Sequence, residues 1–136
     1  MSNCTALRIL NLSYCYQLSD ASAVGNLPAL TSVDLSLCRE LTDVSGLSSC
    51  TALRTLNFSC CRQLIDVSAL SSCTALTSVD LSLCSVTDEG VLPLRSLPAL
   101  IYLDLCDCPK VTAAGVQALR STTAAPNLHI KSGSGW

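Results

Sequence analysis

Cysteine is the residue type with the widest possible chemistry in this chain, because a thiol can form a disulfide, bind a metal or act as a nucleophile. The 136 residues include ten cysteines. No pair has the C-x-x-C spacing of a zinc site, the adjacent Cys60 and Cys61 would point to opposite sides of a strand, and the lone His129 has no partner histidine. The sequence therefore predicts neither a metal site nor a cofactor.

The cysteines recur at a regular interval. Five close a recurring nine-residue segment: Cys15, Cys38, Cys61, Cys84 and Cys108. Three more share a second column with Leu27 and Leu97: Cys4, Cys50 and Cys73. A position that accepts either Cys or Leu requires a small or medium hydrophobic side chain. We interpret these eight cysteines as reduced, structural thiols of a core, with disulfides or metal binding as the alternative, and predict an intracellular, reducing location.

Catalysis would require a nucleophile with a base within hydrogen-bond reach. Ser and Asp are plentiful, but they recur in every copy of the segment, which indicates an architectural role, whereas an active site occurs once. The only histidine, His129, fits an exposed residue of a terminal strand better than a ligand or a base. No glycine-rich phosphate loop is present, since the six glycines are scattered. We predict that the chain is not an enzyme.

Charge and hydropathy limit the partners. The net charge is −2 with only eight Lys and Arg residues, so there is no broad basic field for the phosphates of a nucleic acid. No apolar run approaches the roughly 18 residues that could span a bilayer, and the N-terminus lacks the pattern of a signal peptide. The sequence predicts a soluble, cytoplasmic protein that binds neither nucleic acid nor membrane.

The recurring segment has the frame L-x-x-[LV]-x-[LF]-x-x-C, which begins at Leu7, Leu30, Leu53, Leu76 and Leu100. Its copies, among them LRILNLSYC, LTSVDLSLC and LRTLNFSCC, are each followed by a stretch such as LTDVSGL or VTDEGVL. They resemble the leucine-rich repeat family, in its cysteine-containing class. Within that class the frames are similar to arrays in flagellated protozoa and to F-box ubiquitin-ligase receptors.

A period of 20 to 29 residues predicts a solenoid whose coils share one apolar core. The resemblance implies an α/β fold, a right-handed arc with short parallel strands on its concave face and short helices or 3₁₀ turns on its convex face. We expect the returning turns to be capped by Asp20, Asp43, Asp66 and Asp88, and by Thr112 in the fifth copy.

The domain is predicted to cover residues 1–131, with five repeats that start near residues 4, 27, 50, 73 and 97, and a terminal half-repeat. Residues 132–136 resemble an added flexible tail. The chain begins without an atypical capping repeat, so we expect a fragment of a longer array or an engineered module. An open first coil predicts end-to-end homodimerisation, because an unpaired strand edge invites pairing with another chain.

Alternate residues of each strand should face outward and carry any ligand specificity. The central outward column is Asn11, Asp34, Asn57, Asp80 and Asp104, and Tyr102 lies in the neighbouring column. The central column could be an acidic stripe that attracts a basic peptide or a cation. We favour the alternative that its residues are inherited with the repeat and are solvated.

A second candidate surface lies at the ends of the strands. There, apolar residues precede the closing Cys in a ridge formed by Tyr14, Leu37, Cys60 and Leu83. The ridge is either a contact surface or packs over the next loop. Beside it, Tyr16, Arg39 and Arg62 form a loop column with the composition of an interface hot spot.

The predicted function is a non-catalytic scaffold that binds a protein or peptide. An engineered or truncated repeat module with no natural ligand is one alternative. The substrate-recognition arm of a ubiquitin ligase is a second alternative, which only the resemblance implies.

Overall fold

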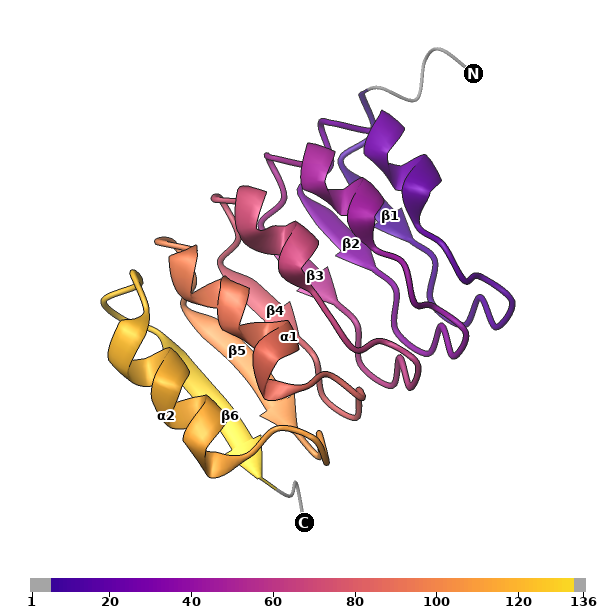
Figure 1. The fold of residues 1–136 in the computed structure, drawn as a ribbon. Helices are drawn as coiled ribbons and strands as arrows, with labels where there is room; N and C mark the ends of the chain where they lie inside the picture. The colour runs from indigo at the N-terminus through magenta and orange to yellow at the C-terminus, as the bar shows by residue number, and fades with distance from the viewer. Residues whose placement is uncertain (1–5, 134–136) are drawn as a thin grey trace.

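The computed structural model describes residues 6–133, which form one parallel sheet and one layer of short helices (Figure 1). The sheet follows the chain from one edge to the other, so each strand pairs with the next. Its strands are β1 (Ile9–Asn11), β2 (Ser32–Asp34), β3 (Thr55–Asn57), β4 (Ser78–Asp80), β5 (Tyr102–Cys106) and β6 (His129–Gly133). This order is that of a solenoid in which each coil adds one strand.

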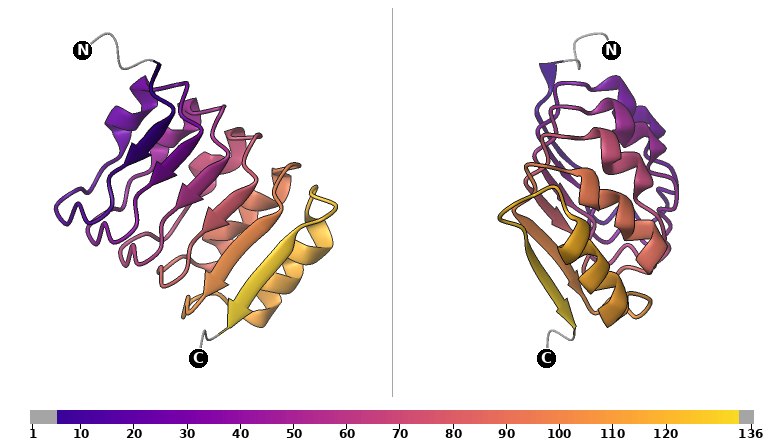
Figure 2. Two further views of the ribbon diagram at one scale, coloured as in Figure 1. Left: turned by 180° about the vertical axis from the view of Figure 1, so that it is seen from behind. Right: turned by 60° about the vertical axis from the view of Figure 1, so that its left-hand side comes forward.

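The helical layer covers one face of the sheet, and the opposite face is open (Figure 2). Its elements are η2 (Ser22–Asn26), η3 (Ser45–Ser49), η4 (Ser68–Ser72), α1 (Asp88–Val91), η5 (Leu92–Ser96) and α2 (Ala113–Thr122), where η denotes a 3₁₀-helix. The first three returning segments are single 3₁₀ turns, as their Ser-rich and Gly-containing sequences predict. The predicted α/β solenoid is confirmed.

The core is a stack of equivalent side chains between the two layers. Val33, Leu56 and Val79 are register partners on neighbouring strands, and each is at most 3% exposed. The second inward position holds Leu35, Phe58, Leu81 and Leu105 in successive coils, all of them buried. In the first coil, Leu10 and Leu12 are only partly buried. The predicted continuous apolar interior is confirmed.

Three of the predicted aspartate caps lie one residue further from the turn than expected. The 3₁₀-helices η2, η3 and η4 have Ala21, Val44 and Val67 at the N-cap position, and none of these makes a side-chain cap bond. The preceding Asp accepts a hydrogen bond from the backbone N–H two residues later, at Ser22, Ser45 and Ser68. These aspartates form Asx turns that lead into the helix. An Asp side chain can bond to the backbone N–H two residues later without the backbone being helical.

The fourth predicted cap, Asp88, is also wrong, because Asp88 is the first residue of α1 and not its cap. Thr87 is the N-cap, and its hydroxyl accepts a hydrogen bond from the N–H of Gly90 at 3.0 Å. The equivalent prediction for Thr112 is confirmed, since its hydroxyl accepts from the N–H of Gly115 at the start of α2. Thr at the N-cap is preferred because its oxygen satisfies a backbone donor of the first turn.

Two residues predicted to begin the tail, Ser132 and Gly133, end strand β6 instead. They pair with Leu105 and Cys106 of β5, which supplies the backbone partners of the strand. The rest of the predicted tail and Cys4 lie outside the described residues. Within residues 6–133, no helix has the length and apolar character needed to cross a membrane.

Candidate functional site

The predicted central column forms a continuous row across the open face of the sheet. Its register is Asn11, Asp34, Asn57, Asp80, Asp104 and then Lys131. The sequence therefore placed its five members correctly but missed Lys131, which lies beside Asp104 on β6. The charge along this row changes sign at its last position.

Each Asp or Asn of the column also has a structural role that the sequence analysis missed. Its Oδ1 atom accepts a hydrogen bond of 2.9 Å from the backbone N–H two residues later. These donors are Ser13, Ser36, Ser59, Ser82 and Cys106. Asn and Asp supply the same oxygen, so this bond does not require the negative charge of Asp34, Asp80 or Asp104. The recurring [DN]-x-S pattern was the available signal.

Tyr102 belongs to a small cluster at the C-terminal side of this face. Its hydroxyl donates a hydrogen bond to Oδ2 of the buried Asp104 at 3.2 Å, and its ring stacks on His129 at 6.1 Å between centroids. Desolvation and then the Asp104 carboxylate raise the pKa of Tyr102. His129 is an exposed residue of β6, as predicted, and its stacking partner was missed.

The predicted ridge consists of residues in the left-handed backbone conformation. The φ angles are 65° for Tyr14, 61° for Leu37, 63° for Cys60 and 60° for Leu83, and Asp107 continues the series at 58°. Each of these residues donates its backbone N–H to a carbonyl oxygen of the following coil, over 2.7–2.9 Å. The left-handed turn therefore ties each coil to the next.

The ridge side chains differ in exposure along its length. Tyr14 is 59% exposed and Leu83 is 41% exposed, whereas Leu37 and Cys60 are half-buried. The ridge thus offers apolar surface chiefly at its two ends. A left-handed conformation costs roughly 1–2 kcal/mol for a residue that carries a Cβ atom. Glycine would avoid this cost, and none of these positions has glycine.

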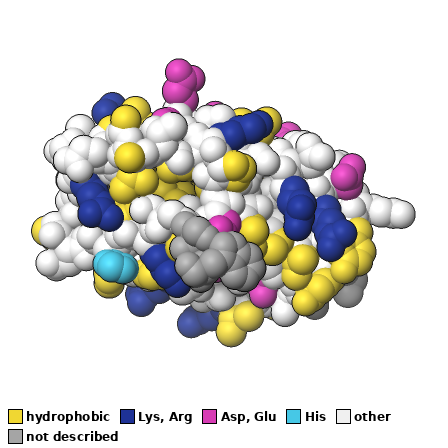
Figure 3. All heavy atoms as spheres, turned by 90° about the horizontal axis from the view of Figure 1, so that it is seen from below, with side chains coloured by type: hydrophobic (Ala, Val, Ile, Leu, Met, Phe, Trp, Pro, Cys, Tyr) yellow, Lys and Arg dark blue, Asp and Glu magenta, His cyan; other side chains and the backbone are white. Residues whose placement is uncertain are grey.

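The loop column brings aromatic and basic groups together beside Tyr14. The rings of Tyr14 and Tyr16 meet edge to face at 6.2 Å, and the guanidinium carbon of Arg39 lies 5.3 Å from the centroid of the Tyr16 ring. Arg62 is exposed in the next coil. In the view from below, basic side chains adjoin hydrophobic ones at one side of the molecule (Figure 3). We call Tyr14, Tyr16, Leu37, Arg39 and Arg62 the rim patch.

The described cysteines of the two columns pack in or against the core. The nine cysteines within the described residues are free thiols, and six of the seven described members of the two cysteine columns are buried. Burial raises the pKa of Cys61 to about 12 and the pKa of Cys73 to about 11. A raised pKa keeps a thiol protonated and weakens it as a nucleophile or metal ligand. Among residues 6–133, no group of three His, Cys, Asp or Glu could hold a metal ion.

Comparisons with known proteins point to one kind of fold. A family model described as a leucine rich repeat matches residues 72–94. An internalin, inlF, from Listeria monocytogenes superposes with a TM-score of 0.66 at 27% identity, over 85% of this chain and 31% of that one. Among curated proteins, no sequence matches the chain.

Two further solved structures share the fold at lower identity. The yeast Rad7 and Elc1 complex matches with a TM-score of 0.66 at 21% identity, over 91% of this chain and 32% of that one. A TLR13-ssRNA13 complex matches with a TM-score of 0.62 at 20% identity, over 94% of this chain and 19% of that one. The chain thus spans about a third or less of each of these three proteins.

Proposed function

We propose that this chain, which shares the fold of leucine-rich repeat proteins, acts as a non-catalytic scaffold that binds a protein or peptide through its rim patch. A solenoid of this kind offers a continuous, extended surface for binding. The buried thiols and the repeated Ser and Asp residues have structural roles, which supports a binding role over a catalytic one.

The observation that carries the proposal is the exposure of aromatic side chains beside Arg39 in the rim patch. Tyr14 is 59% exposed and Tyr16 is 49% exposed, and the guanidinium of Arg39 lies over the Tyr16 ring. Bulky side chains at Tyr14, Leu37 and Leu83 occupy left-handed positions where glycine would be less strained. The left-handed turn itself recurs in every coil and ties it to the next, so this conformation is architectural and does not by itself mark a binding site. At Tyr14 and Leu83 the side chain is also exposed, so core packing does not account for its size.

The chemistry of the rim patch indicates the kind of partner. Tyr and Arg are enriched among the residues that dominate binding energy at interfaces. Tyr14 and Tyr16 present apolar rings, and the guanidinium groups of Arg39 and Arg62 can form bidentate bonds with carboxylates. We propose a partner segment with an apolar or aromatic side chain beside acidic residues. Asp34 and Asp80 of the central column would contact basic residues of the same partner.

The test is selection of peptides from a displayed library on the folded chain, followed by measurement of Kd for the selected sequences. We expect selected peptides to combine aromatic and acidic residues and to lose at least about tenfold in affinity for Tyr16→Ala and for Arg39→Ala. Ile101→Ala is the matched control, because Ile101 is 56% exposed and precedes β5 at the other end of the strands. Peptides that bind both rim variants as tightly as the unaltered chain would contradict the proposal.

The other predicted properties stay predictions. They are the cytoplasmic location, the absence of a nucleic-acid partner, the end-to-end homodimer, the engineered or truncated module and the ubiquitin-ligase arm. The Rad7 and Elc1 complex matches at 21% identity, which supports a shared fold only.

A further inference from the structure

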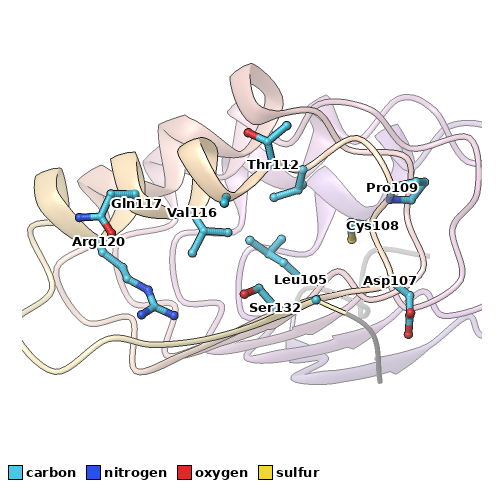
Figure 4. Close-up of a pocket in the computed structure, with 12 residues that line it drawn as sticks. Leu105, Asp107, Cys108, Pro109, Thr112, Val116, Gln117, Arg120 and Ser132 are labelled. Carbon is cyan, nitrogen blue, oxygen red and sulfur yellow. The ribbon is translucent and has the colours of Figure 1, made fainter. Parts of the chain in front are cut away.

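A cavity of about 700 Å³ lies between helix α2 and the ends of strands β5 and β6 (Figure 4). Its apolar wall is formed by Leu105, Val111 and Val116, together with Cys108. The volume lies within the range of pockets that bind small molecules, and a mainly apolar wall with a few polar groups is typical of them.

One residue of β6, Ser132, contributes to the cavity through its small size. The second inward position of earlier coils holds Leu35, Phe58 and Leu81, which are fully buried. In β6 the register partner of Leu105 is Ser132, which is small, polar and exposed. Ser132 therefore fills less of the space beside Leu105 than a leucine side chain at the same inward position would fill.

The polar groups around the cavity are arranged asymmetrically. Arg120 and Gln117 of α2 lie toward one end, and Asp107 lies toward the other (Figure 4). The Nη2 atom of Arg120 donates a hydrogen bond to the carbonyl oxygen of Ile130 at 3.2 Å, which holds the guanidinium close to β6. A guanidinium carries five N–H donors, so this bond leaves donors for an anionic ligand.

We propose that this cavity binds a small amphipathic carboxylate. Its apolar body would contact Leu105, Val111 and Val116, and its carboxylate would bind the guanidinium of Arg120. Charge complementarity favours this class of ligand at one end of the cavity, because Arg120 is the only basic side chain among the cavity residues and pairs of guanidinium and carboxylate are strong. Asp107, the acidic side chain of the lining, lies at the opposite end, where the apolar body of the ligand would be (Figure 4). The proposal is independent of the rim patch, which lies in the first three coils.

The experiment is a titration of the isotope-labelled protein with naphthalene-2-carboxylate, followed by the methyl NMR signals of Leu105 and Val116 and by calorimetry. We expect both signals to shift with saturation. The neutral amide of the same ring system should bind at least about tenfold more weakly, since it lacks the charge that pairs with Arg120. Equal affinity for the acid and the amide would overturn the proposed role of Arg120, and no saturable shift would overturn the site.

Two variants and one control separate binding from an effect on folding. Arg120→Gln should reduce the affinity for the acid at least about tenfold and leave the affinity for the amide unchanged. Ser132→Leu should fill the cavity and abolish binding of both compounds while the circular dichroism spectrum is retained. Arg95→Gln removes an exposed arginine of η5 and should change nothing. Loss of acid binding in Arg95→Gln equal to that in Arg120→Gln would contradict the assignment.

The same experiment also detects whether something other than a small carboxylate fills the cavity. If Trp136→Ser binds the probe and the unaltered chain does not, the end of the chain itself is the occupant and the proposal fails. If sedimentation velocity shows a dimer and the probe binds only after dilution to monomer, a second copy is the occupant and the proposal also fails.

Discussion

The thiol of Cys84 donates a hydrogen bond to the backbone carbonyl oxygen of Phe58, 3.0 Å away in the preceding coil. The same bond joins Cys38 to Leu12 at 3.2 Å and Cys61 to Leu35 at 3.0 Å. In the last case, Cys108 bonds to Leu81 at 2.9 Å. The closing Cys of each of the last four frames is therefore both a core side chain and a donor that links consecutive coils.

Replacement of Cys61 separates these two roles. Cys61→Val keeps most of the buried volume and removes the donor, so we expect the free energy of unfolding to fall by about 1 kcal/mol. Cys61→Ala removes the donor and leaves a cavity, so the loss should be about 2 kcal/mol. Urea unfolding measures both values. Cys60→Ala is the control, because Cys60 is half-exposed and should cost less than about 0.5 kcal/mol. Equal stability of Cys61→Val and the unaltered chain would show that the thiol is only a filler.

Alkaline pH should destabilise the fold through the buried thiols. Burial raises the pKa of Cys61 to about 12 and the pKa of Cys108 to about 11. An unfolded thiol has a pKa of about 8.5, so the unfolded state loses protons first as the pH rises. The stability that these protonated thiols contribute is complete below about pH 8.5 and is lost as the pH rises toward 11 to 12.

The measurement is the free energy of unfolding in urea at pH 7.5 and at several values up to about pH 10. Tyr and Lys also titrate in this range, so the comparison is between the unaltered chain and Cys61→Val. We expect a smaller decrease with pH in the variant, because one buried thiol is gone. The same decrease in both proteins would show that ionisation of Cys61 does not contribute.

The strand columns could be predicted from the sequence for two reasons. Inward and outward residues alternate along every strand, and the strands recur at a nearly constant interval. One residue of error would have moved Leu56 from the core to the open face. Its pairing with Val33 and Val79 shows that no such error occurred. The five residues of the central column follow from the same alternation.

The turn after each strand could not be predicted from residue preferences. Tyr, Leu and Cys disfavour the left-handed conformation, which is typical of Gly and Asn. At Leu37 and Leu83 the backbone N–H bonds to a carbonyl oxygen of the next coil, 2.8 Å and 2.9 Å away. These hydrogen bonds between coils override the local backbone preference. The residue types within one repeat do not reveal them, because the acceptor lies in the next repeat. The cavity beside Ser132 was missed for a related reason, since it depends on what neighbouring coils place around one position.

Leu83→Gly should make the fold slightly more stable. Glycine removes a left-handed strain of roughly 1–2 kcal/mol. It also raises the conformational entropy of the unfolded chain, which costs about 0.5–1 kcal/mol. We expect a net gain of about 0.5 kcal/mol, measured by urea unfolding.

The control for this variant is Ile101→Gly, at an exposed apolar residue whose φ is not positive. It should lose about 0.5–1 kcal/mol, because only the entropic cost applies there. If Leu83→Gly loses as much as Ile101→Gly, then the Leu83 side chain stabilises the fold by packing. In that case packing would explain why a large side chain occurs at position 83, and no role in binding would be required.

The last prediction concerns Asp88, whose carboxylate joins the two α-helices. Its two oxygens accept hydrogen bonds from the backbone N–H and the hydroxyl of Thr112, at 2.8 Å and 2.6 Å. Gly115 leaves room for this contact, since a Cβ atom at that position would collide with the Asp88 carboxylate. The sequence analysis expected a cap for the helix that follows Asp88, but the side chain stabilises the start of the next one.

A double-mutant cycle measures this bond. Asp88→Ala and Thr112→Val together should cost less than the sum of the two single variants by about 1 kcal/mol, because either change alone already removes the hydroxyl bond. Asp66→Ala with Thr112→Val is the control pair, since Asp66 bonds to Ser68 within its own coil and should be additive within about 0.5 kcal/mol. Additivity in both pairs would mean that the contact of Asp88 with Thr112 does not couple the two coils. In that case Thr112 would act only as the cap of α2.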